Sequence, residues 1–416
     1  MIDLCSQESS PMLPIEDALA RIKNTIHPLK ASETVLLKDA LGRILSEAVY
    51  APINSPNETN SAMDGYAFSS AEITKGLEFS LNLIGTSWAG RPFKGVLQAG
   101  QCIRIFTGAV VPSEADSIII QEQVESDGQY IHFPIDTIGG QHIREVGEDM
   151  QQGSLLFASP KKLNAIDLGL LASAGVCEVS VSRPLKIAFF STGDELTELG
   201  KPLFSGQIYD SNRYALHGLL NDINYIATDM GVIGDDKQLL EESFIEAAKN
   251  HDVIITTGGV SVGEADYVKE ILSRCGEVNF WKIAIKPGKP LAFGKIGDCY
   301  FFGLPGNPVA VIVTFQYIVS PALKHLLGAT ETKTIKLAAI CTSTLKKAPG
   351  RQEYQRGILT QDAAGNFFVA SSGKQGSNIM KSLSEANCYI VLPVACEGIQ
   401  AGERVMIDLI PSGEWI

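Results

Sequence analysis

The sequence predicts a multidomain protein with a doubly wound α/β domain near its centre and β-rich segments on either side. Between residues 185 and 318, short apolar runs alternate with helical patterns, as they do in βαβ units. Two of these runs, at 252–259 and 300–308, break into the glycine-rich turns T-T-G-G and L-P-G-N-P. A chain of 416 residues is also long for one hydrophobic core, so we expect two to four domains.

Composition excludes several classes of protein. The net charge of −13 argues against a general nucleic-acid partner or an anionic membrane surface. We expect no apolar run to approach the roughly 20 residues that a membrane span needs, and residues 1–14 lack the pattern of a signal peptide. The eight cysteines are scattered without a C-x-x-C pair. We therefore expect reduced thiols in a cytoplasmic protein.

The first 180 residues mix two kinds of pattern. Apolar residues at helical spacing predict a helix over 14–26 and a second helical segment over 34–50. From 79 to 157 the pattern changes to short alternating runs between Gly and Pro, which predicts an inserted, mostly β domain. A further helix is expected over 164–174, so the helical domain is discontinuous in sequence. The expected strands of the insert are 81–84, 102–106, 117–121 and 130–133.

The second half of the chain predicts an α/β sheet followed by a β structure. The expected strands of the sheet are 185–190, 225–233, 253–256, 280–285, 291–293 and 300–304, and the expected helices are 211–221, 239–249, 267–274 and 309–327. From residue 334 onward the chain is β again, with strands at 335–340, 353–359, 366–370, 388–392 and 404–409. A small sheet or barrel of roughly 80 residues fits this pattern.

Three strand-to-helix turns of the α/β domain are candidates for ligand binding. Ligands of open α/β sheets bind beyond the carboxyl ends of the strands. Gly258, Gly259 and Gly306 would let the backbone approach a ligand, and the helix starts would offer free N–H groups to an anion. The third turn is T-G-D-E at 192–195. One such turn alone could equally be an ordinary tight turn, but three on one sheet favour a binding site.

Acidic residues gather near the same turns and strand ends: Glu195, Asp235, Asp236, Glu264 and Asp266. Several carboxylates in one crevice repel one another unless a cation balances them, which suggests Mg²⁺ held with waters and phosphate oxygens. The alternative is that these carboxylates cap helices or occupy their first turns. For Asp235, which begins a predicted helix, this alternative is a serious competitor.

A basic segment follows, W-K-I-A-I-K-P-G-K-P at 281–290. Strand alternation would place Lys282 and Lys286 on one face if the strand is regular, and the Pro-Gly turn would fix Lys289 nearby. Ammonium groups clustered on a rigid loop suit phosphate or another tetrahedral oxyanion. A solvated lysine face is the alternative, and the turn residues count against it.

Several common catalytic arrangements are not supported. None of the six histidines lies in a nucleophile motif, and the sequence has neither G-x-x-x-x-G-K-[ST] nor G-x-G-x-x-G. We therefore expect catalysis by positioning and by electrostatic stabilisation of a phosphoryl group.

Eight motifs, taken in order, resemble the molybdopterin molybdenumtransferase (MoeA) family, whose relatives include the E domain of gephyrin. They are S-A-M-D-G-Y-A, R-I-F-T-G-A, R-E-V-G-E-D, S-T-G-D-E-L, I-Y-D-S-N, T-T-G-G-V-S-V-G-E-A-D-Y, I-K-P-G-K-P and G-L-P-G-N-P. The likeness covers about residues 14–409, and eight ordered motifs make it highly specific.

The resemblance implies the last step of molybdenum cofactor synthesis. Such enzymes take adenylyl-molybdopterin and molybdate, cleave the phosphoanhydride with the help of Mg²⁺, release AMP and leave molybdenum on the dithiolene. It implies a homodimer, with the molybdopterin adenylyltransferase and molybdoenzyme chaperones as candidate partners. It implies four domains: a helical domain I at 1–50 and 145–180, an inserted β domain II at 51–144, an α/β molybdopterin-binding domain III at 181–328 and a β-barrel domain IV at 329–416.

The resemblance also implies an active site between the α/β domain of one subunit and the inserted domain of the other. The implied catalytic residues are Asp64, Thr107, Arg144, Asp149, Glu195, Asp235, Asp266, Lys282 and Lys286, with Glu195, Asp235 and Asp266 on Mg²⁺. Those implied for the pterin substrate are Thr192, Gly193, Gly258, Gly259, Ser261, Gly263, Pro305, Gly306, Asn307 and Pro308. Those implied for molybdate are Lys286, Lys289, Pro290, Arg351 or Arg356, and Ser377.

One departure from the family pattern and two other functions remain. The loop before M-D-G-Y reads S-P-N-E-T-N at 55–60, where the family usually carries a proline and an aromatic residue, but Asp64 is retained. A non-catalytic scaffold would be expected to tolerate losses among the charged site residues, and none is lost here. A molybdopterin adenylyltransferase shares the α/β domain but generally stands alone, so the first 180 residues and the barrel argue against it.

Overall fold

The computed structural model describes residues 12–259, 270–271, 274–329 and 336–410. The chain divides into two compact units, each described here by itself. The larger unit contains Met1–Glu33, Gly42–Ile44 and Ser182–Ile416, and the smaller contains Thr34–Leu41 and Leu45–Val181. The four domain boundaries given above stay a prediction.

The larger unit is built around a six-stranded mixed sheet, in the order β16-β13-β17-β21-β20-β18. Its strands are β13 (Leu185–Thr192), β16 (Tyr225–Ile233), β17 (Val253–Thr257), β18 (Glu277–Lys282), β20 (Pro290–Ile296) and β21 (Cys299–Leu304). The first four in spatial order run parallel, whereas β20 is antiparallel to both of its neighbours. From β13 the chain goes first to β16 on one side and then to β17 on the other. The sheet order therefore reverses between β13 and β17, which is where doubly wound folds bind ligands.

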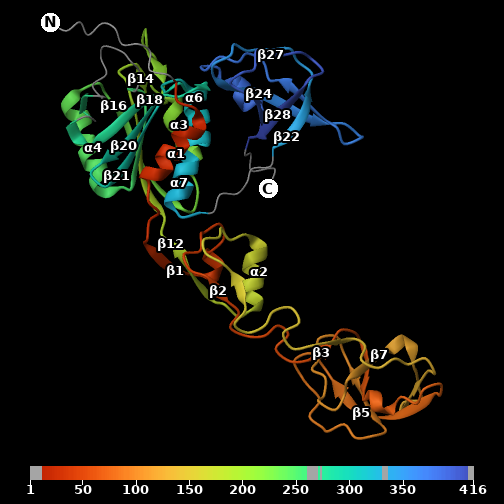
Figure 1. The fold of residues 1–416 in the computed structure, drawn as a ribbon. Helices are drawn as coiled ribbons and strands as arrows, with labels where there is room; N and C mark the ends of the chain where they lie inside the picture. The colour runs from red at the N-terminus through yellow and green to blue at the C-terminus, as the bar shows by residue number, and fades with distance from the viewer. Residues whose placement is uncertain (1–11, 260–269, 272–273, 330–335, 411–416) are drawn as a thin grey trace, which may run out of the picture. The chain divides into compact units, whose positions relative to one another are not determined.

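Helices cover both faces of this sheet (Figure 1). They are α1 (Ile15–Thr25), α3 (Ser211–Leu219), α4 (Lys237–Asn250), α6 (Pro308–Thr314) and α7 (Ser320–Leu326). Successive strand residues point to opposite faces, so Phe190 meets Phe244 of α4, with ring centroids 5.3 Å apart, while Phe189 packs in the cluster of α1, α3, α6 and α7. The predicted doubly wound α/β fold is thus confirmed.

Helices α6 and α7 are joined by the π-helical turn η4 (Phe315–Val319) into one apolar helix, Pro308–Leu326. Its 19 residues are long and apolar enough to cross a membrane, so the expectation that no run approaches that length is wrong. In the fold, 61% of an 18-residue stretch of this helix is buried, and Val309, Val311 and Val313 lie in the core against the sheet. A core position accounts for its composition.

The C-terminal strands form a closed barrel. Its strands are β22 (Leu337–Cys341), β24 (Gln352–Gln361), β25 (Phe367–Ser371), β26 (Cys388–Leu392) and β28 (Arg404–Leu409), with a short helix α8 (Met380–Ser384) and the short strands β23 (Leu345–Lys346) and β27 (Gly398–Ile399). The order β24-β25-β22-β28-β26 returns to β24, which confirms the predicted barrel. The two-residue strand β19 (Ile285–Lys286) pairs in parallel with β24, so the middle of the 281–290 segment joins the barrel sheet.

This pairing overturns the single strand expected over 280–285. Strand β18 ends at Lys282, the next two residues bend out of the sheet, and β19 belongs to the barrel. Residues 267–269 and 272–273 of the helix expected at 267–274 lie outside the described residues.

The smaller unit is mostly β, and it contains the β pattern predicted over 79–157. Its largest sheet has the order β7-β4-β6-β5-β9-β8. These strands are β4 (Gly65–Phe68), β5 (Phe79–Ser87), β6 (Gln101–Ile105), β7 (Ser117–Ile120), β8 (Glu125–Ser126) and β9 (Tyr130–Phe133). Two short ladders pair β2 (Val49–Tyr50) with β11 (Leu155–Phe157) and β3 (Asn60–Ser61) with β10 (Ile143–Arg144). Helix α2 (Ala165–Ser173) begins at a capping box formed by Asn164 and Asp167.

The helix expected over 34–50 is wrong. The chain forms β1 (Ser32–Leu36), which pairs with β12 (Glu178–Ser182), then a short 3₁₀ turn at Leu37–Asp39. Pairing with the distant strand β12 outweighs the local helical pattern, and Gly42, whose φ of 76° is left-handed, prevents a right-handed helix from continuing toward residue 50.

We predict that Asp252→Asn lowers the stability of the larger unit without changing its chemistry. Asp252, just before β17, accepts from both terminal nitrogens of Arg183 at 2.7 and 2.8 Å and from the N–H of Lys186 at 2.8 Å. Breaking this partly buried pair should lower the free energy of unfolding by about 1–3 kcal/mol, measured by urea denaturation.

The pH dependence gives the check on this prediction. Burial raises the pKa of Asp252, but the hydrogen bonds and charge of Arg183 and the N–H of Lys186 outweigh it, so the pKa is lowered. The stabilisation is therefore present above the pKa of the unfolded chain and is lost as pH falls through the folded pKa. The difference in the free energy of unfolding between wild type and Asp252→Asn should become smaller in acid. A difference that stays constant from neutral to acid pH would contradict the prediction.

Candidate active site

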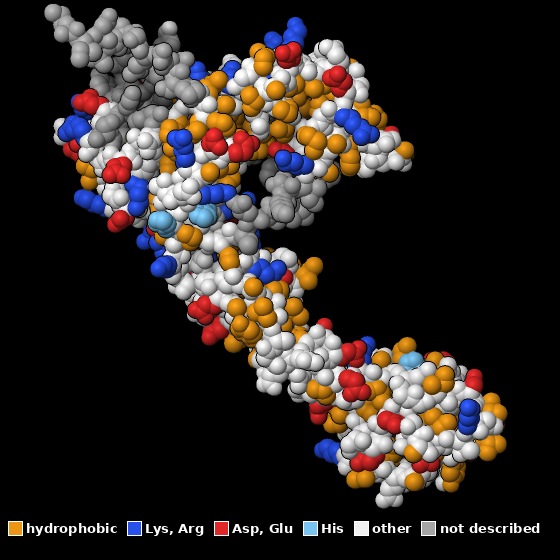
Figure 2. Space-filling view, viewed as in Figure 1, with side chains coloured by type: hydrophobic (Ala, Val, Ile, Leu, Met, Phe, Trp, Pro, Cys, Tyr) orange, Lys and Arg blue, Asp and Glu red, His pale blue; other side chains and the backbone are white. Residues whose placement is uncertain are grey.

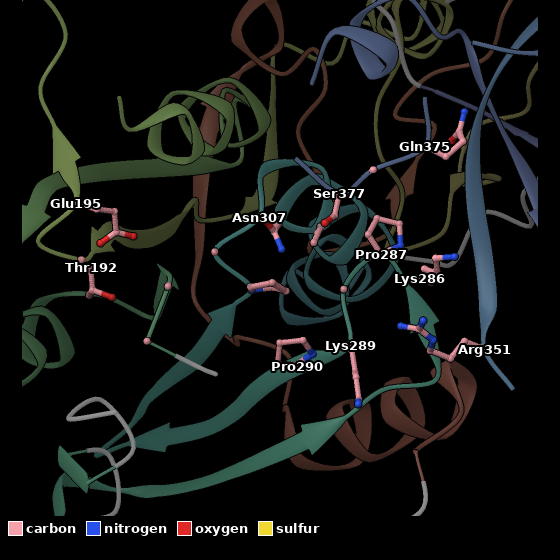
Figure 3. Close-up of a pocket in the computed structure, with 18 of the residues that line it drawn as sticks. Thr192, Glu195, Lys286, Pro287, Lys289, Pro290, Asn307, Arg351, Gln375 and Ser377 are labelled. Carbon is pink, nitrogen blue, oxygen red and sulfur yellow. The ribbon is translucent and has the colours of Figure 1, made fainter. Parts of the chain in front are cut away.

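A cavity of about 710 Å³ opens at the carboxyl ends of β13 and β17, within the larger unit. The three predicted ligand turns and the 286–290 segment line it together with barrel residues (Figure 3). The lining residues are Thr192, Gly193, Glu195, Asp235, Gly258, Gly259, Lys286, Pro287, Gly288, Lys289, Pro290, Pro305, Gly306, Asn307, Ala310, Arg351, Gln375, Gly376 and Ser377. The sequence thus predicted residues that come together here from four separate segments.

At two positions in the turns that line the cavity, only glycine can be accommodated. Gly258 has φ 88°, and a Cβ atom there would lie 2.6 Å from the carbonyl oxygen of Thr192. Gly288 has φ 117°, and its Cβ would lie 2.5 Å from the hydroxyl of Thr314. Both contacts are far shorter than real Cβ atoms allow. The glycines therefore let neighbouring backbones approach closely at the floor of the cavity.

A buried hydrogen-bond network holds these turns in place. The Ser191 hydroxyl donates to Asp210 at 3.0 Å and lies 2.9 Å from the Thr257 hydroxyl, which ties the ends of β13 and β17. Asp210 also accepts from the N–H of Arg213 and so caps α3. From that helix, the Asn212 amide donates to the carbonyl of Gly306 at 2.7 Å. All three turns are thus anchored to one another.

The α/β side of the cavity is acidic. Glu195 and Asp235 line it, and the N–H of Asp235 donates to Asp194 at 3.0 Å. Burial and the negative charges of Asp194 and Glu195 raise the pKa of Asp235. The capping alternative for Asp235 is wrong, because Asp236 is the residue that caps α4, accepting from the N–H of Leu239 at 2.8 Å. Asp194 was not among the predicted site residues.

The described carboxylates could bind a divalent cation only if water molecules supplied most of its ligands. Among the described residues, no three His, Cys, Asp or Glu side chains are grouped to hold a metal ion. Asp266, together with Ser261 and Gly263, lies outside the described residues. Burial and the repulsion from Asp194 and Glu195 raise the pKa of Asp235, and a bound cation would relieve the repulsion. Mg²⁺ commonly keeps several waters beside one or two carboxylates.

The opposite side of the cavity is cationic. Lys286, Lys289 and Arg351 line it, and Figure 3 shows them across the cavity from Glu195 and Thr192. Ser377 and Pro290 also border this side. Lys282 does not line the cavity. It is the last residue of β18, and its carbonyl accepts from the N–H of Leu13. The expectation that Lys282 and Lys286 share a strand face is therefore wrong.

The two candidate arginines have different surroundings. Arg351 lines the cavity, whereas Arg356 is 1% exposed and is not among the lining residues. Its guanidinium donates to the carbonyls of Lys374, Gln375 and Gly376 at 2.9–3.1 Å. Arg356 thus holds the loop that carries Ser377. Gln375 and Gly376 on this loop were missed, although the run S-S-G-K-Q-G-S at 371–377 is a recognisable turn signal.

Four predicted residues belong to the smaller unit. The Asp64 carboxylate accepts from both the N–H and the hydroxyl of Thr107, each at 2.8 Å. These two hydrogen bonds, with a smaller effect of the Arg104 charge, lower the pKa of Asp64. Arg144 is exposed on β10, opposite Asn60, and the N–H of Asp149 donates to the carbonyl of Ser55 at 2.9 Å. Pro308, in the larger unit, begins α6 and is not among the lining residues.

On the face of the molecule shown in Figure 2, Lys and Arg side chains are interspersed with Asp and Glu side chains. The three cations of the cavity are therefore not an extension of a broad basic surface on that face. The three cations of the cavity belong to a protein whose net charge is −13.

Comparison with known families gives three matches in chain order. Residues 13–175 match the MoeA N-terminal region (domain I and II), residues 188–325 a probable molybdopterin binding domain, and residues 338–410 the MoeA C-terminal region (domain IV).

Individual relatives agree along nearly the whole chain. A molybdopterin molybdenumtransferase of Haemophilus influenzae is 42% identical over 400 residues, covering 95% of this chain and 98% of that protein. Gephyrin of Dictyostelium discoideum is 31% identical, covering 96% of this chain and 62% of that protein. The crystal structure of a molybdopterin biosynthesis MoeA protein from Pyrococcus horikoshii superposes with a TM-score of 0.81 at 31% identity, covering 96% and 99% of the two chains. On these matches, this chain belongs to the MoeA (molybdopterin molybdenumtransferase) family.

Proposed function

We propose that this protein inserts molybdenum into molybdopterin, using adenylyl-molybdopterin and molybdate and releasing AMP. Family membership supports the transferase reaction on molybdopterin. The observation that carries the proposal is the polarity of the cavity, which has carboxylates on one side and three cationic side chains on the other. A substrate with a phosphoanhydride and a separate tetrahedral dianion needs both a cation site and an oxyanion site in one space.

The chain's own residues would divide the work between the two sides. The turns at Gly258 and Gly306 would let the substrate phosphates approach the backbone closely, although the N–H of Gly258 itself already donates to the carbonyl of Leu304. Glu195 and Asp235, with Asp266, would hold Mg²⁺, which supplies charge stabilisation at the phosphoanhydride. Lys286, Lys289 and Arg351 would hold molybdate, with the Ser377 hydroxyl as a further donor. In this arrangement catalysis consists of holding two reactants together and stabilising developing charge.

We further propose a cytoplasmic homodimer that works beside a molybdopterin adenylyltransferase and molybdoenzyme chaperones. The support for a dimer is that Asp64, Thr107, Arg144 and Asp149 carry the family's site motifs but lie in the smaller unit, whereas the cavity lies in the larger one. Light scattering at micromolar concentration tests it, and a purely monomeric protein would contradict it.

The reaction is tested by AMP release. With adenylyl-molybdopterin as substrate, AMP release should depend on molybdate and should saturate with it. Release at the same rate without molybdate would contradict molybdenum insertion. A protein that instead binds ATP together with molybdopterin would be an adenylyltransferase, and one that shows neither behaviour would be a scaffold.

The acidic side is tested by Glu195→Gln and Asp235→Asn, with Glu246→Gln on the exposed face of α4 as the control. Both site variants should lower AMP release by about tenfold or more and raise the Mg²⁺ concentration needed for half-maximal rate. Asp235→Asn should leave the melting temperature unchanged or higher, since the raised pKa shows that its charged form is disfavoured in the fold. A marked fall in melting temperature with unchanged Mg²⁺ dependence would mean that these carboxylates are structural.

The cationic side is tested by Lys289→Ala. Molybdate is a strongly hydrated dianion, so it needs fixed positive charge and donors to leave water. Losing one charged hydrogen bond of about 1.5–3 kcal/mol should weaken molybdate use by one to two orders of magnitude. Binding of adenylyl-molybdopterin should suffer less, because its phosphates have other partners. Lys249→Ala, an exposed lysine of α4, is the matched control; loss of pterin affinity with an unchanged molybdate dependence would assign Lys289 to the wrong anion.

A further inference from the structure

Lys286 differs from the other cations of the cavity because it is already paired. Its ammonium group donates to Oε1 of Glu353 at 2.9 Å. Among the residues that the structure describes, neither Lys289 nor Arg351 makes an ion pair with a carboxylate. Among the described residues, the cavity therefore has two cations without a carboxylate partner and one that is held by a carboxylate.

Glu353 is a carboxylate in an unusual place. Its side chain is 5% exposed, whereas that of Lys286 is 45% exposed. Its second oxygen, Oε2, accepts from the Gln355 side chain at 3.0 Å, and Gln355 in turn donates to the carbonyl of Lys346. A carboxylate this deeply buried costs stability unless it is paired, so both of its donors are needed.

The backbone fixes the geometry of this pair. Lys286 of β19 and Glu353 of β24 are register partners in the parallel ladder, so their side chains leave the sheet next to each other. Lys286 lines both the main cavity and an adjoining cavity of about 210 Å³ in the barrel, whereas Glu353 lines only the adjoining one. The lysine thus stands between the two spaces, with the carboxylate behind it.

We propose that Glu353 is a positioning residue for the oxyanion site: it holds the Lys286 ammonium at the wall of the main cavity. This inference rests on the proposed function, because the anion it serves is the molybdate substrate. A flexible four-carbon side chain loses rotamer freedom when it binds an anion, and a partner that fixes it beforehand removes part of that cost. Glu353 itself does not line the main cavity, so it acts through Lys286.

Two other roles for Glu353 predict different behaviour. If the carboxylate mainly cancels the lysine charge, removing it should strengthen anion binding. If it only stabilises the barrel, removing it should lower stability and leave the molybdate dependence unchanged whether or not Lys286 is present.

A double-mutant cycle on the full-length protein separates these roles. The variants are Glu353→Gln, Lys286→Ala and the double variant, each assayed for the molybdate concentration that gives half-maximal AMP release. Glutamine keeps the size of Glu353 but has a single acceptor oxygen, so it cannot serve both Lys286 and Gln355. Glu353→Gln should raise the molybdate requirement about tenfold in the wild-type background, the size of one charge-assisted hydrogen bond.

In the Lys286→Ala background, Glu353→Gln should change the molybdate requirement by less than about twofold, because there is no ammonium left to position. An equal effect in both backgrounds, or a lower molybdate requirement in Glu353→Gln, would overturn the proposal. Glu353→Asp, which keeps the charge on a shorter side chain, should recover part of the loss. Asp252→Asn is the matched control, since it breaks an ion pair of the same unit without touching the cavity.

A readout that needs no enzymatic turnover keeps this inference separate from the proposed function. The rate at which an acetylating reagent modifies Lys286, measured by peptide mass spectrometry, should rise in Glu353→Gln while the rate at Lys289 stays unchanged. An unchanged rate at Lys286 would overturn the positioning role even if AMP release depends on molybdate. Molybdate-independent AMP release with faster labelling of Lys286 would overturn the proposed function alone.

Discussion

The geometry of the cavity depends on the hydrogen bonds and the ion pair of one buried carboxylate, that of Asp210. It is 1% exposed, and it joins the end of β13, through Ser191, to the first turn of α3. Arg213 balances its charge with a side-chain hydrogen bond at 3.2 Å and also reaches Asp229 on β16. Asn212, in the first turn of the same helix, donates to the carbonyl of Gly306. The paired carboxylate of Asp210 therefore helps to set the spacing of all three turns. Such a buried pair specifies an arrangement more than it adds stability.

The charges of the cavity come from separate parts of the larger unit. The acids follow strands of the α/β sheet, whereas the cations come from the 286–290 segment and from the barrel. The 286–290 segment can supply them because the chain leaves the α/β sheet after Lys282 and pairs with the barrel at β19. This change of sheet is what brings Arg351 and Ser377 of the barrel to the edge of the α/β domain. Opposite charges are thereby kept apart, so that neither set neutralises the other before substrates bind.

The sequence allowed the sheet, the barrel and most lining residues to be predicted, because local pattern determines them. Glycine turns after apolar runs at Gly258 and Gly306 mark the ligand end of a sheet, whatever the tertiary contacts. Two predictions were wrong because pairing with a distant strand outweighed the local pattern. The expected helix at 34–50 gives way to a strand that pairs with β12 and is also interrupted at Gly42, and Lys286 pairs with β24 and not with the strand that contains Lys282. The pairing of Lys286 with Glu353 joins positions 67 residues apart and could not be read from either segment alone.

The buried positive charge of Arg356 affects the cavity wall beyond the hydrogen bonds that the residue makes. All the partners of its guanidinium, within the part of the chain that the structure describes, are neutral: backbone carbonyls and the Ser382 hydroxyl. Carbonyl dipoles solvate a cation without cancelling it, and a buried charge is poorly screened. The loop over Gln375, Gly376 and Ser377 therefore carries a permanent positive electrostatic potential although none of these residues is charged. An anion approaching that wall is attracted by a group it never touches, and salt in the solvent weakens this attraction far less than it weakens that of an exposed lysine.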